Sequence, residues 1–424
     1  MTGLNRLSCD IAIVGAGPAG LAAARAASTS QRSIVVIDDN PRLGGQIWRD
    51  GPGVVLPASA QSYRKVLSQP NVRYLAGTRI VAALAPGALL LEDAQSGCRL
   101  DYGQLILCCG ARELLLPFPG WTLPGVTGAG ALQALIKGGA PVAGERLVVA
   151  GSGPLLLASA GTARAAGAVL TGVYEQAARQ QVISFGTGLL RWPDKLTQAF
   201  RLLSTHYRWA SYVVEALGDN RLEAVRIRQG GRDKVVPCTR LACGFGLVPN
   251  TELASHLGCQ LEGDAVAVDR YQQTSQTGLY AAGECTGVGG SELALIEGEI
   301  AGLAAIGKVE QAKTLFPRRE HWQRFARHVQ AHFRLRPEVR QLARADTLIC
   351  RCEDVALSAL VGEQGWDAAK LQSRCGMGAC QGRVCGTAAR ELFGWALPEP
   401  RIPLVPARVE TLMAIPRAHS RHHS

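Results

Sequence analysis

Residues 9–20 read CDIAIVGAGPAG, and this stretch decides the fold of the 424-residue chain. Its first six residues are largely apolar, as in a strand that is buried on both faces of a parallel sheet. A glycine turn follows, then an alanine-rich helix over 21–27 and a β-branched strand over 33–37 that ends at Asp38. Strand, glycine turn, helix, strand and acid form a βαβ unit of the dinucleotide-binding kind. The sequence therefore predicts an α/β protein with a parallel sheet.

Three glycines give this turn its chemistry. Gly15 allows the tight turn, Gly17 lets the backbone approach a pyrophosphate, and Gly20 lets the helix pack on the strand. The phosphates are expected at the positive end of the helix, where unpaired backbone amides point outward. Asp38 can then accept hydrogen bonds from ribose hydroxyls, and a second glycine turn, 44–46, brings more backbone close to the ligand. The alternative is a glycine-rich connection between strands that binds nothing.

The same pattern recurs in the middle of the chain. A strand leads to the run 151–156, GSGPLL, and a helix and a further strand end at Glu175. Leu156 stands where the third glycine would be, which favours looser packing of the helix on the strand. Gly151, Gly153 and Glu175 are therefore candidate contacts for an adenine nucleotide, ATP or NAD. A vestigial nucleotide site is the alternative.

Two such units in one chain, the second inserted into the first, are the pattern of flavoproteins with two dinucleotide-binding domains. The return to the first domain is expected at 278–284, where a strand enters a glycine turn, followed by a helix. The proline-rich end is expected to be an extended, partly disordered tail. The predicted division is an FAD-binding domain in two parts, a second nucleotide-binding domain, linker helices, a cysteine-rich domain and the tail: 1–115 with 250–315, 116–249, 316–345, 346–397 and 398–424.

Composition bounds the function. The chain has 47% hydrophobic and 19% charged residues, which excludes a disordered protein. No stretch offers the roughly 20 strongly apolar residues of a membrane span, and the N-terminus lacks the basic and apolar regions of a signal peptide. We therefore expect a cytoplasmic protein, at most peripheral to the inner membrane. The net charge of +11 comes without a lysine-rich run or interleaved aromatic residues, so we expect no nucleic-acid partner.

Five of the thirteen cysteines fall between residues 350 and 385. Cys350 and Cys352 form a Cys-x-Cys pair, and Cys375, Cys380 and Cys385 follow after a helical stretch. Two close thiols followed by a second group of thiols have the spacing of a metal site. Four thiolates suit a [2Fe–2S] cluster. A zinc site and a metal-free thiol cluster are the alternatives.

This region resembles the bacterioferritin-associated ferredoxin domain in two segments, 349–355 (ICRCEDV) and 374–386 (RCGMGACQGRVCG). In that domain the last ligand opens a helix, as Cys385 does here. The resemblance implies a [2Fe–2S] cluster with four thiolate ligands: Cys350, Cys352, Cys380 and Cys385. Four residues separate the last two ligands, whereas the small ferredoxin has two. The pair Cys375 and Cys380 has the same spacing and stays open as an alternative; otherwise Cys375 is spare.

Four segments of the nucleotide-binding part resemble the FAD-binding segments of flavoproteins: 15–20, 44–46, 109–111 and 283–284. In that family the position of Glu284 is usually aspartate, which holds the ribityl or phosphate part of FAD. The resemblance implies that FAD contacts the following residues: Gly15, Ala16, Gly17, Pro18, Ala19, Asp38, Asp39, Gly44, Gly45, Gln46, Gly110, Ala111, Gly283 and Glu284.

The cysteines of the nucleotide-binding part do not match those of disulfide reductases. Those enzymes carry a redox cysteine pair just after the second glycine turn or in the second nucleotide domain. After Gly45 this chain has no cysteine until Cys98. The remaining candidates lie in or beside predicted core strands and are expected to be buried structural thiols: Cys108, Cys109, Cys238 and Cys243.

From its first strand to about Leu397, the chain resembles the A (alpha) subunits of bacterial opine oxidases and D-hydroxyproline dehydrogenases and the B subunit of hydrogen cyanide synthase. The resemblance implies an electron-transfer protein with FAD and a [2Fe–2S] cluster that serves a respiratory or dye acceptor within a heteromeric complex. It implies a D-amino-acid-oxidase-like FAD partner that oxidises an opine, D-hydroxyproline or glycine-like amine. Further implied members are FMN at an interface between subunits and a third, small ferredoxin-like subunit. No constellation of histidine, tyrosine or arginine marks an amine pocket, so no catalytic residue is assigned.

Two other functions fit parts of the sequence. A stand-alone NAD(P)H-dependent FAD/iron–sulfur oxidoreductase would use both nucleotide units, and rapid bleaching of the flavin by NADH would favour it. A depot for iron or copper on the cysteines is a non-enzymatic alternative, which a redox-silent flavin would favour. The sequence names neither the amine nor the final electron acceptor.

Overall fold

The first nucleotide fold is built on a seven-stranded sheet in the computed structural model, which describes residues 4–396 and 399–415. The strand order is β3-β2-β1-β6-β5-β4, with β19 beside β6. The strands are β1 (Asn5–Val14), β2 (Ile34–Ile37), β3 (Val72–Leu75), β4 (Arg79–Ala85), β5 (Ala88–Glu92), β6 (Gly97–Leu107) and β19 (Leu279–Ala281). Strands β4, β5 and β6 pair antiparallel and the others parallel. Ala12 and Ile13, neighbours on β1 that point to opposite faces, are both fully buried.

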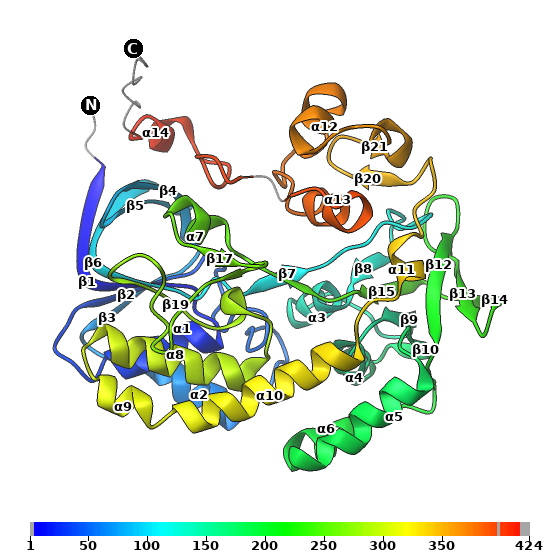
Figure 1. The fold of residues 1–424 in the computed structure, drawn as a ribbon, viewed down its shortest axis with the longest axis horizontal. Coiled ribbons are helices and arrows are strands. Elements are labelled where there is room, and N and C mark those ends of the chain that lie inside the picture. The colour runs from blue at the N-terminus through cyan, green and yellow to red at the C-terminus, as the bar shows by residue number, and fades with distance from the viewer. Residues whose placement is uncertain (1–3, 397–398, 416–424) are drawn as a thin grey trace.

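Helices α1 (Pro18–Ala27) and α8 (Ser291–Ala305) pack closely on each other beside this sheet (Figure 1). A Cβ atom on Gly298 would lie 2.1 Å from the carbonyl oxygen of Ala19, and one on Gly302 would lie 2.4 Å from that of Ala23. Glycine is therefore required on α8 for the two backbones to touch. Because α8 follows the second fold in the chain, this contact closes the first fold around the insertion.

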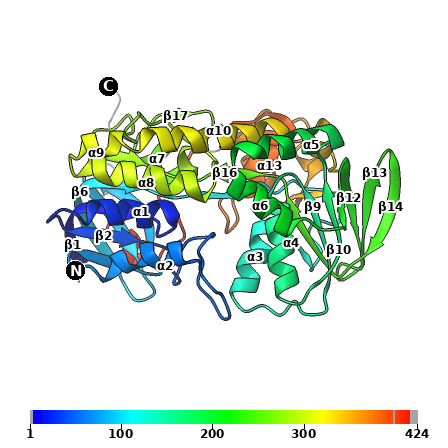
Figure 2. The same cartoon turned by 90° about the horizontal axis from the view of Figure 1, so that it is seen from below.

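The second nucleotide fold has a five-stranded parallel sheet in the order β11-β10-β9-β15-β8. Its strands are β8 (Val126–Gly128), β9 (Arg146–Gly151), β10 (Val169–Glu175), β11 (Tyr207–Arg208) and β15 (Arg240–Gly244). The helices are α3 (Ala129–Lys137), α4 (Leu155–Ala165), α5 (Arg179–Gly188), η2 (Leu189–Arg191) and α6 (Pro193–Leu202). A three-stranded antiparallel sheet lies at the edge (Figure 2): β12 (Ser211–Leu217), β13 (Ala224–Gln229) and β14 (Arg232–Pro237). The predicted class, two dinucleotide-binding folds in one α/β chain, is confirmed.

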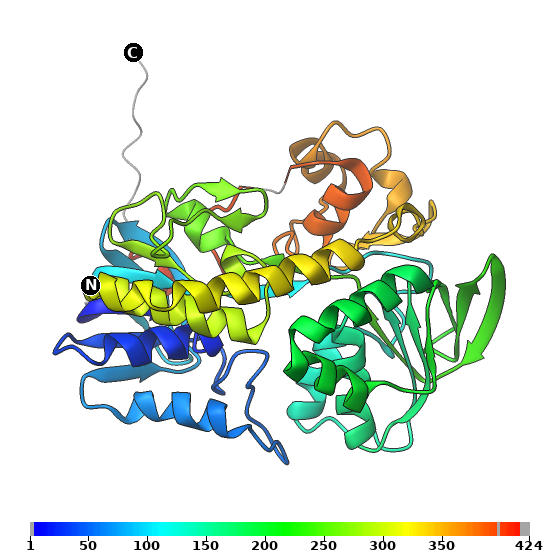
Figure 3. The same cartoon turned by 60° about the horizontal axis from the view of Figure 1, so that its bottom comes forward.

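The chain crosses between the two folds on a pair of antiparallel strands, β7 (Ala111–Glu113) and β16 (Leu247–Pro249). Helix α10 (Phe316–His332) makes a further connection, because it packs against α8 of the first fold and α5 of the second (Figure 3). No helix in the described part of the chain has the length and hydrophobicity needed to cross a membrane. The smaller elements of the first fold are α2 (Ala58–Arg64), η1 (Lys65–Ser68), α7 (Glu252–His256), β17 (Leu261–Glu262), β18 (Ala265–Val266), η3 (Glu284–Thr286) and α9 (Val309–Lys313).

A small module with its own core follows the linker. Its elements are β20 (Leu348–Cys350), β21 (Val355–Ala356), η4 (Leu357–Ala359), α12 (Trp366–Ser373) and α13 (Cys385–Phe393). The preceding helix α11 (Pro337–Arg340) belongs to the linker, and its Val339 packs in the core of the second fold. Ile349, Leu360 and Ala369 are fully buried in this core together with Cys375. Cys350 and Cys385 belong to the same core. Three of the five clustered cysteines are therefore packed among buried side chains.

Residues 399–415 return to the first fold, which differs from the extended tail that the prolines predict. The Leu404 N–H donates a hydrogen bond to the Val81 carbonyl oxygen at 2.8 Å. The segment ends in a short helix, α14 (Val409–Leu412), and its apolar side chains pack on the buried face of β4 and β5. The apolar residues between the prolines thus cover this part of the sheet. The remainder of the expected tail, 398 and 416–424, lies outside the described residues.

Candidate functional site

The first glycine turn is shaped by close backbone contacts. Gly15 has a φ of +102°, and a Cβ atom there would lie 2.2 Å from the carbonyl oxygen of Cys108. A Cβ atom on Gly20 would lie 1.7 Å from the carbonyl oxygen of Gly15. Gly17 differs, because a Cβ atom there would meet only the Cα atom of Gly45, at 3.8 Å. Gly15 and Gly20 therefore hold the turn together, while Gly17 leaves space beside it.

The second glycine turn lies against the first. The Gly44 N–H donates to the carbonyl oxygen of Ala16 at 3.1 Å. A Cβ atom on Gly45 would lie 3.0 Å from the Cα atom of Gly17 and would fill the space between the two turns. Gln46 is exposed at the end of this turn, and its carbonyl oxygen accepts a hydrogen bond from Lys137 of the second fold at 3.3 Å. Bare backbone on both sides of a gap is what a pyrophosphate needs, so the residues present fit a dinucleotide such as FAD.

Asp38 is held at the same place by backbone hydrogen bonds. Its carboxylate accepts the Ala16 N–H at 2.6 Å and the Asn40 N–H at 2.8 Å, and only 6% of the residue is exposed. Asp39 is exposed and accepts a hydrogen bond from the Asn40 side chain at 2.9 Å. Asp38 therefore organises the turn at the start of α1, which includes Pro18, and Asp39 offers a free carboxylate edge beside it.

The late segment 283–284 also meets the first turn. A Cβ atom on Gly283 would lie 2.7 Å from the Cβ atom of Ala19. The Gly283 N–H donates to the Glu297 carboxyl group at 3.0 Å. Burial raises the pKa of Glu297 to about 7, and burial also raises the pKa of Glu284. Sequence reasoning missed Glu297, which is the one buried acid of the three on helix 291–305.

Gly110 and Ala111 complete this edge. Gly110 has a φ of +67°, and its carbonyl oxygen accepts the Asn250 N–H at 3.0 Å. The Asn250 side chain donates to the carbonyl oxygen of Cys109 at 2.9 Å. Cys285, next to Glu284, lies beside the Cys109–Gly110 backbone. The structure thus brings all four predicted FAD segments together. The sequence of any one segment does not predict its contacts with the others.

The glycine turn of the second nucleotide fold, residues 151–153, is built similarly, but groups within the protein accept its hydrogen bonds. A Cβ atom on Gly151 would lie 2.0 Å from the carbonyl oxygen of Gly244. Glu175 is fully buried, and its carboxylate accepts the Gly153 N–H at 2.7 Å and the Ala177 N–H at 2.8 Å. Burial raises the pKa of Glu175 to about 7. Glu175 therefore braces the turn from inside the protein.

A linker segment covers this turn. The Ser152 hydroxyl donates to the carbonyl oxygen of Phe333 at 2.8 Å. A Cβ atom on Gly153 would lie 3.7 Å from the Phe333 side chain. Gln176 ties the next residues down, because its side chain donates to the Arg334 carbonyl oxygen and accepts the Arg336 N–H, both at 3.0 Å. Phe333 therefore lies beside Gly153, the glycine at which the backbone would approach the pyrophosphate of a dinucleotide. The local sequence of the turn does not predict its contact with the segment 333–336.

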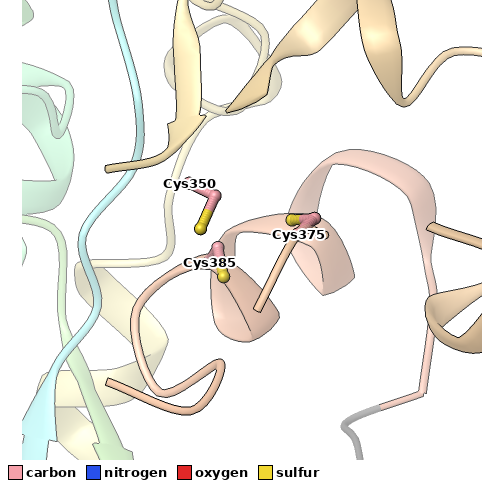
Figure 4. A group of neighbouring side chains, drawn as sticks. All are labelled: Cys350, Cys375 and Cys385. Atoms are coloured by element: carbon pink, nitrogen blue, oxygen red, sulfur yellow. The ribbon is translucent and has the colours of Figure 1, made fainter. Parts of the chain in front are cut away.

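The thiol cluster contains all five cysteines of the C-terminal module. The sulfur atoms of Cys350, Cys375 and Cys385 lie within 4.8 Å of one another and are buried (Figure 4). Cys380 lies against Cys385 and also against the exposed Cys352. The thiol hydrogen bond from Cys385 lowers the pKa of Cys380, which favours the thiolate that binds metals. A set of cysteine thiolates fits an iron–sulfur cluster in its chemistry. Cys375, which the sequence leaves as a spare thiol, lies as close to Cys350 and Cys385 as a ligand could.

Glycines allow the cysteine loop to reach the other thiols. A Cβ atom on Gly378 would lie 2.3 Å from the Cβ atom of Cys352. A Cβ atom on Gly376, whose φ is +82°, would lie 2.4 Å from the Trp366 ring. Cys385 opens helix α13, as the sequence predicts. The Gly-Met-Gly run is therefore required by close packing around the cluster.

Arg112 connects this loop to the first fold. It lies on β7, pairs with Glu252 at 2.8 Å and donates to the Asn250 side chain at 2.8 Å. Its Nε donates to the carbonyl oxygen of Arg383, between Cys380 and Cys385, at 3.2 Å. Because Asn250 also holds the backbone at Cys109, a short polar chain joins the expected flavin edge to the thiol loop.

We expect Arg112→Gln to loosen the thiol loop without removing it. The variant loses the ion pair with Glu252 and the bond to Arg383, a cost of about 1–3 kcal/mol in local opening free energy. Hydrogen exchange of amides 378–386 should become faster. Arg228→Gln is the matched control, because Arg228 pairs with Asp233 at 2.7 Å on the β13–β14 hairpin, outside the thiol module. Equal exchange rates in the two variants would show that Arg112 does not anchor the loop.

The other predicted structural thiols are placed as follows. Cys238 and Cys243 are buried in the second fold, and Cys108 is buried beside the first glycine turn. Cys109 is partly buried, and burial raises the pKa of all four thiols. High pKa values oppose thiolate chemistry. These cysteines are therefore suited to packing rather than to redox exchange.

Comparisons with known proteins agree with this architecture. Residues 9–314 match the family described as pyridine nucleotide-disulphide oxidoreductase. Hydrogen cyanide synthase subunit HcnB of Pseudomonas aeruginosa is 31% identical, over 93% of this chain and 96% of that protein. The A subunit of opine oxidase from Rhizobium meliloti is 32% identical, over 89% of this chain and 90% of that protein. The crystal structure of L-proline dehydrogenase from P. horikoshii aligns with a TM-score of 0.69 at 18% identity, over 97% of this chain and 81% of that chain.

Proposed function

The chain belongs to the pyridine nucleotide-disulphide oxidoreductase family, in the group that holds hydrogen cyanide synthase subunit HcnB and the A subunit of opine oxidase, and from this membership we propose that it is the electron-transfer subunit of a heteromeric amine or imino-acid dehydrogenase. The family implies FAD. We propose that FAD is held by the residues around Gly17, Gly45 and Asp38, and a [2Fe–2S] cluster by Cys350, Cys352, Cys380 and Cys385. The donors are opine, D-hydroxyproline or glycine-like amines.

The placement of the two cofactor sites supports a path for electrons. Flavin exchanges two electrons, and a [2Fe–2S] centre carries them one at a time. Arg112 and Asn250 fix the thiol loop against the strand ends that surround the flavin edge. On the other side, the Trp121 indole donates to the carbonyl oxygen of Leu348 at 2.7 Å, and the Arg351 guanidinium lies 4.7 Å from the Trp121 ring. The module is thus anchored to the connection between the two folds at two points.

The observation that carries the proposal is that the linker segment 333–336 lies over the glycine turn 151–153. Phe333, with Gln176 holding Arg334 and Arg336, occupies the approach to Gly153. This contact supports the proposal that NAD(P)H does not bind at this turn and that the electrons come from another donor. A partner subunit of the D-amino-acid-oxidase type is the proposed source. FMN at the interface and a third, small ferredoxin-like subunit are further members of the proposed complex.

The alternative is a stand-alone NAD(P)H-dependent FAD/iron–sulfur oxidoreductase. It requires the segment 333–336 to leave the turn, which breaks the Ser152 and Gln176 hydrogen bonds. The same holds for an adenine nucleotide, ATP or NAD, at this place. The closed arrangement favours the subunit role over both.

We expect that the isolated chain does not oxidise amines. The two nucleotide folds and the thiol module occupy nearly all of the described chain, and flavin amine oxidation needs the substrate held against the ring in a closed pocket. The co-expressed pair with a D-amino-acid-oxidase-like subunit should reduce an artificial dye with an opine, D-hydroxyproline or glycine. The measurement compares amine-dependent dye reduction by the chain and by the pair under the same acceptor.

NADH added to the flavin-loaded chain provides the second arm of this experiment. The flavin absorbance should remain, because the covered turn does not admit the nucleotide. Full amine-dependent dye reduction by the isolated chain contradicts the subunit role. Rapid bleaching by NADH contradicts it as well and supports the stand-alone reductase.

A further inference from the structure

A cavity of about 510 Å³ lies outside both predicted cofactor sites, between helix α10 and the segment that joins α5 to α6. Its volume falls within the range of small-molecule sites. The residues that line the cavity are not among those assigned to FAD, to the glycine turn 151–153 or to the thiol cluster. They are Arg191, Trp192, His321, Arg324, Arg327 and His328.

The charge of this cavity is not compensated. Among the described residues, Arg191, Arg324 and Arg327 form no ion pair within 4.0 Å, whereas the neighbouring Lys195 pairs with Glu292 of α8 at 2.6 Å. No acid lines the cavity. All three arginines are exposed side chains, and three guanidinium groups around one space repel one another. An anion in the cavity removes that repulsion.

The aromatic wall of the cavity is rigid. Trp192 is 5% exposed and stacks on His328, with ring centroids 5.6 Å apart. His328 also stacks on Phe185 at 5.0 Å, and its Nε2 lies 3.1 Å from the Phe185 carbonyl oxygen. Phe325 contacts the Trp192 ring edge-on at 5.3 Å. The backbone segments that carry the arginines are therefore packed against this stack.

We propose that this cavity binds a small polyanion with clustered oxygen atoms, such as a pyrophosphate or a polycarboxylate. Guanidinium groups bind phosphate and carboxylate oxygens in a bidentate manner, and several together fit a ligand with more than one anionic group. Arg191 belongs to the second fold, and Arg324 and Arg327 belong to α10, which packs on the first fold as well. The bound anion therefore joins the α5–α6 segment to α10.

The test is calorimetric titration of the full-length, flavin-loaded chain with inorganic pyrophosphate and with citrate at constant ionic strength. Saturable binding of one anion per chain is expected. Arg324→Ala and Arg327→Ala should each weaken it about tenfold or more, because each removes charged hydrogen bonds. Arg318→Ala is the matched control, since Arg318 is exposed on the same helix and does not line the cavity. Its affinity should equal that of the unaltered chain.

Comparison of the two probes identifies the ligand chemistry. Tighter binding of pyrophosphate indicates a phosphate ligand, and tighter binding of citrate indicates a carboxylate ligand. Weaker binding in the Arg324 and Arg327 variants distinguishes binding in this cavity from binding at the flavin edge or at the glycine turn 151–153. The proposal is overturned if neither probe binds saturably, or if Arg318→Ala weakens binding as much as Arg324→Ala does. The latter result would mean general attraction to a basic helix.

Discussion

The Gly17→Glu protein is expected to fold normally and to purify without flavin. Gly17 has φ −77° and ψ −172°, an extended conformation that any residue adopts. A side chain there meets only the Gly45 backbone, so it enters the space expected for the pyrophosphate. Two like charges about 4 Å apart repel by roughly 4 kcal/mol at an effective dielectric constant of 20, about a thousandfold in affinity. Flavin absorbance relative to protein absorbance measures the loss.

Two variants control this experiment. Gly17→Gln adds nearly the same volume without the charge and should retain more flavin than Gly17→Glu. Gly15→Ala should fail to fold, because a Cβ atom at Gly15 would lie 2.2 Å from the Cys108 carbonyl oxygen in a backbone with φ +102°. Normal flavin content in a folded Gly17→Glu protein would refute the assignment of the first turn as the FAD site.

Loss of Cys380 is expected to abolish the iron–sulfur cluster, whereas loss of Cys375 is expected to leave it in place. The assigned ligands are Cys350, Cys352, Cys380 and Cys385, and the intact protein should contain about two iron and two sulfide per chain. Cys380→Ser removes a thiolate ligand, so the paramagnetic signal of the reduced cluster should disappear. Cys375→Ser should keep that signal. Metal analysis and spectroscopy of the dithionite-reduced proteins make the comparison.

The structure makes this test necessary. Cys375 is fully buried and its sulfur lies within 4.8 Å of those of Cys350 and Cys385, so proximity alone does not identify the spare thiol. Cys259→Ser is a suitable control, because Cys259 is buried in the first fold, away from the cluster. Signal loss in Cys375→Ser together with retention in Cys380→Ser would exchange the two assignments. Zinc in place of iron in the intact protein would overturn both.

Two features bear on the chemistry that the family name describes. Its cysteines near the first glycine turn, Cys108 and Cys285, are buried single thiols whose pKa is raised by burial, and they form no disulfide in the described structure. Its second nucleotide turn is covered by Phe333. In the described structure, the second fold holds the linker through the Ser152 and Gln176 hydrogen bonds.

Local patterns were enough to predict both nucleotide folds. The apolar strand 9–14, the glycine turn and the acid at Asp38 act within one βαβ unit, so their spacing carries the information. The same is true of the Cys350–Cys352 pair and of the helix that begins at Cys385. In each case the interacting residues are close in the chain, or the backbone conformation of one residue decides the outcome.

Leu156 shows how a distant residue accommodates a change in a local motif. It stands at the position of the third glycine and is fully buried, and a Cβ atom on Gly244 would lie 3.0 Å from its side chain. The glycine on the neighbouring strand β15 makes room for the leucine. The two positions are far apart in the chain, so only the folded protein relates them.

By itself, the sequence determined the two nucleotide folds, the edge where FAD is expected and the group of thiols. Only the tertiary structure decided that Phe333 lies against the glycine turn 151–153, that Arg112 holds the thiol loop, and that residues 399–415 pack on β4 and β5. These features are contacts between segments that lie far apart in the chain. Periodicity and motif spacing encode conformation over a few residues, whereas the choice of a distant partner depends on which surfaces the complete fold brings together and buries.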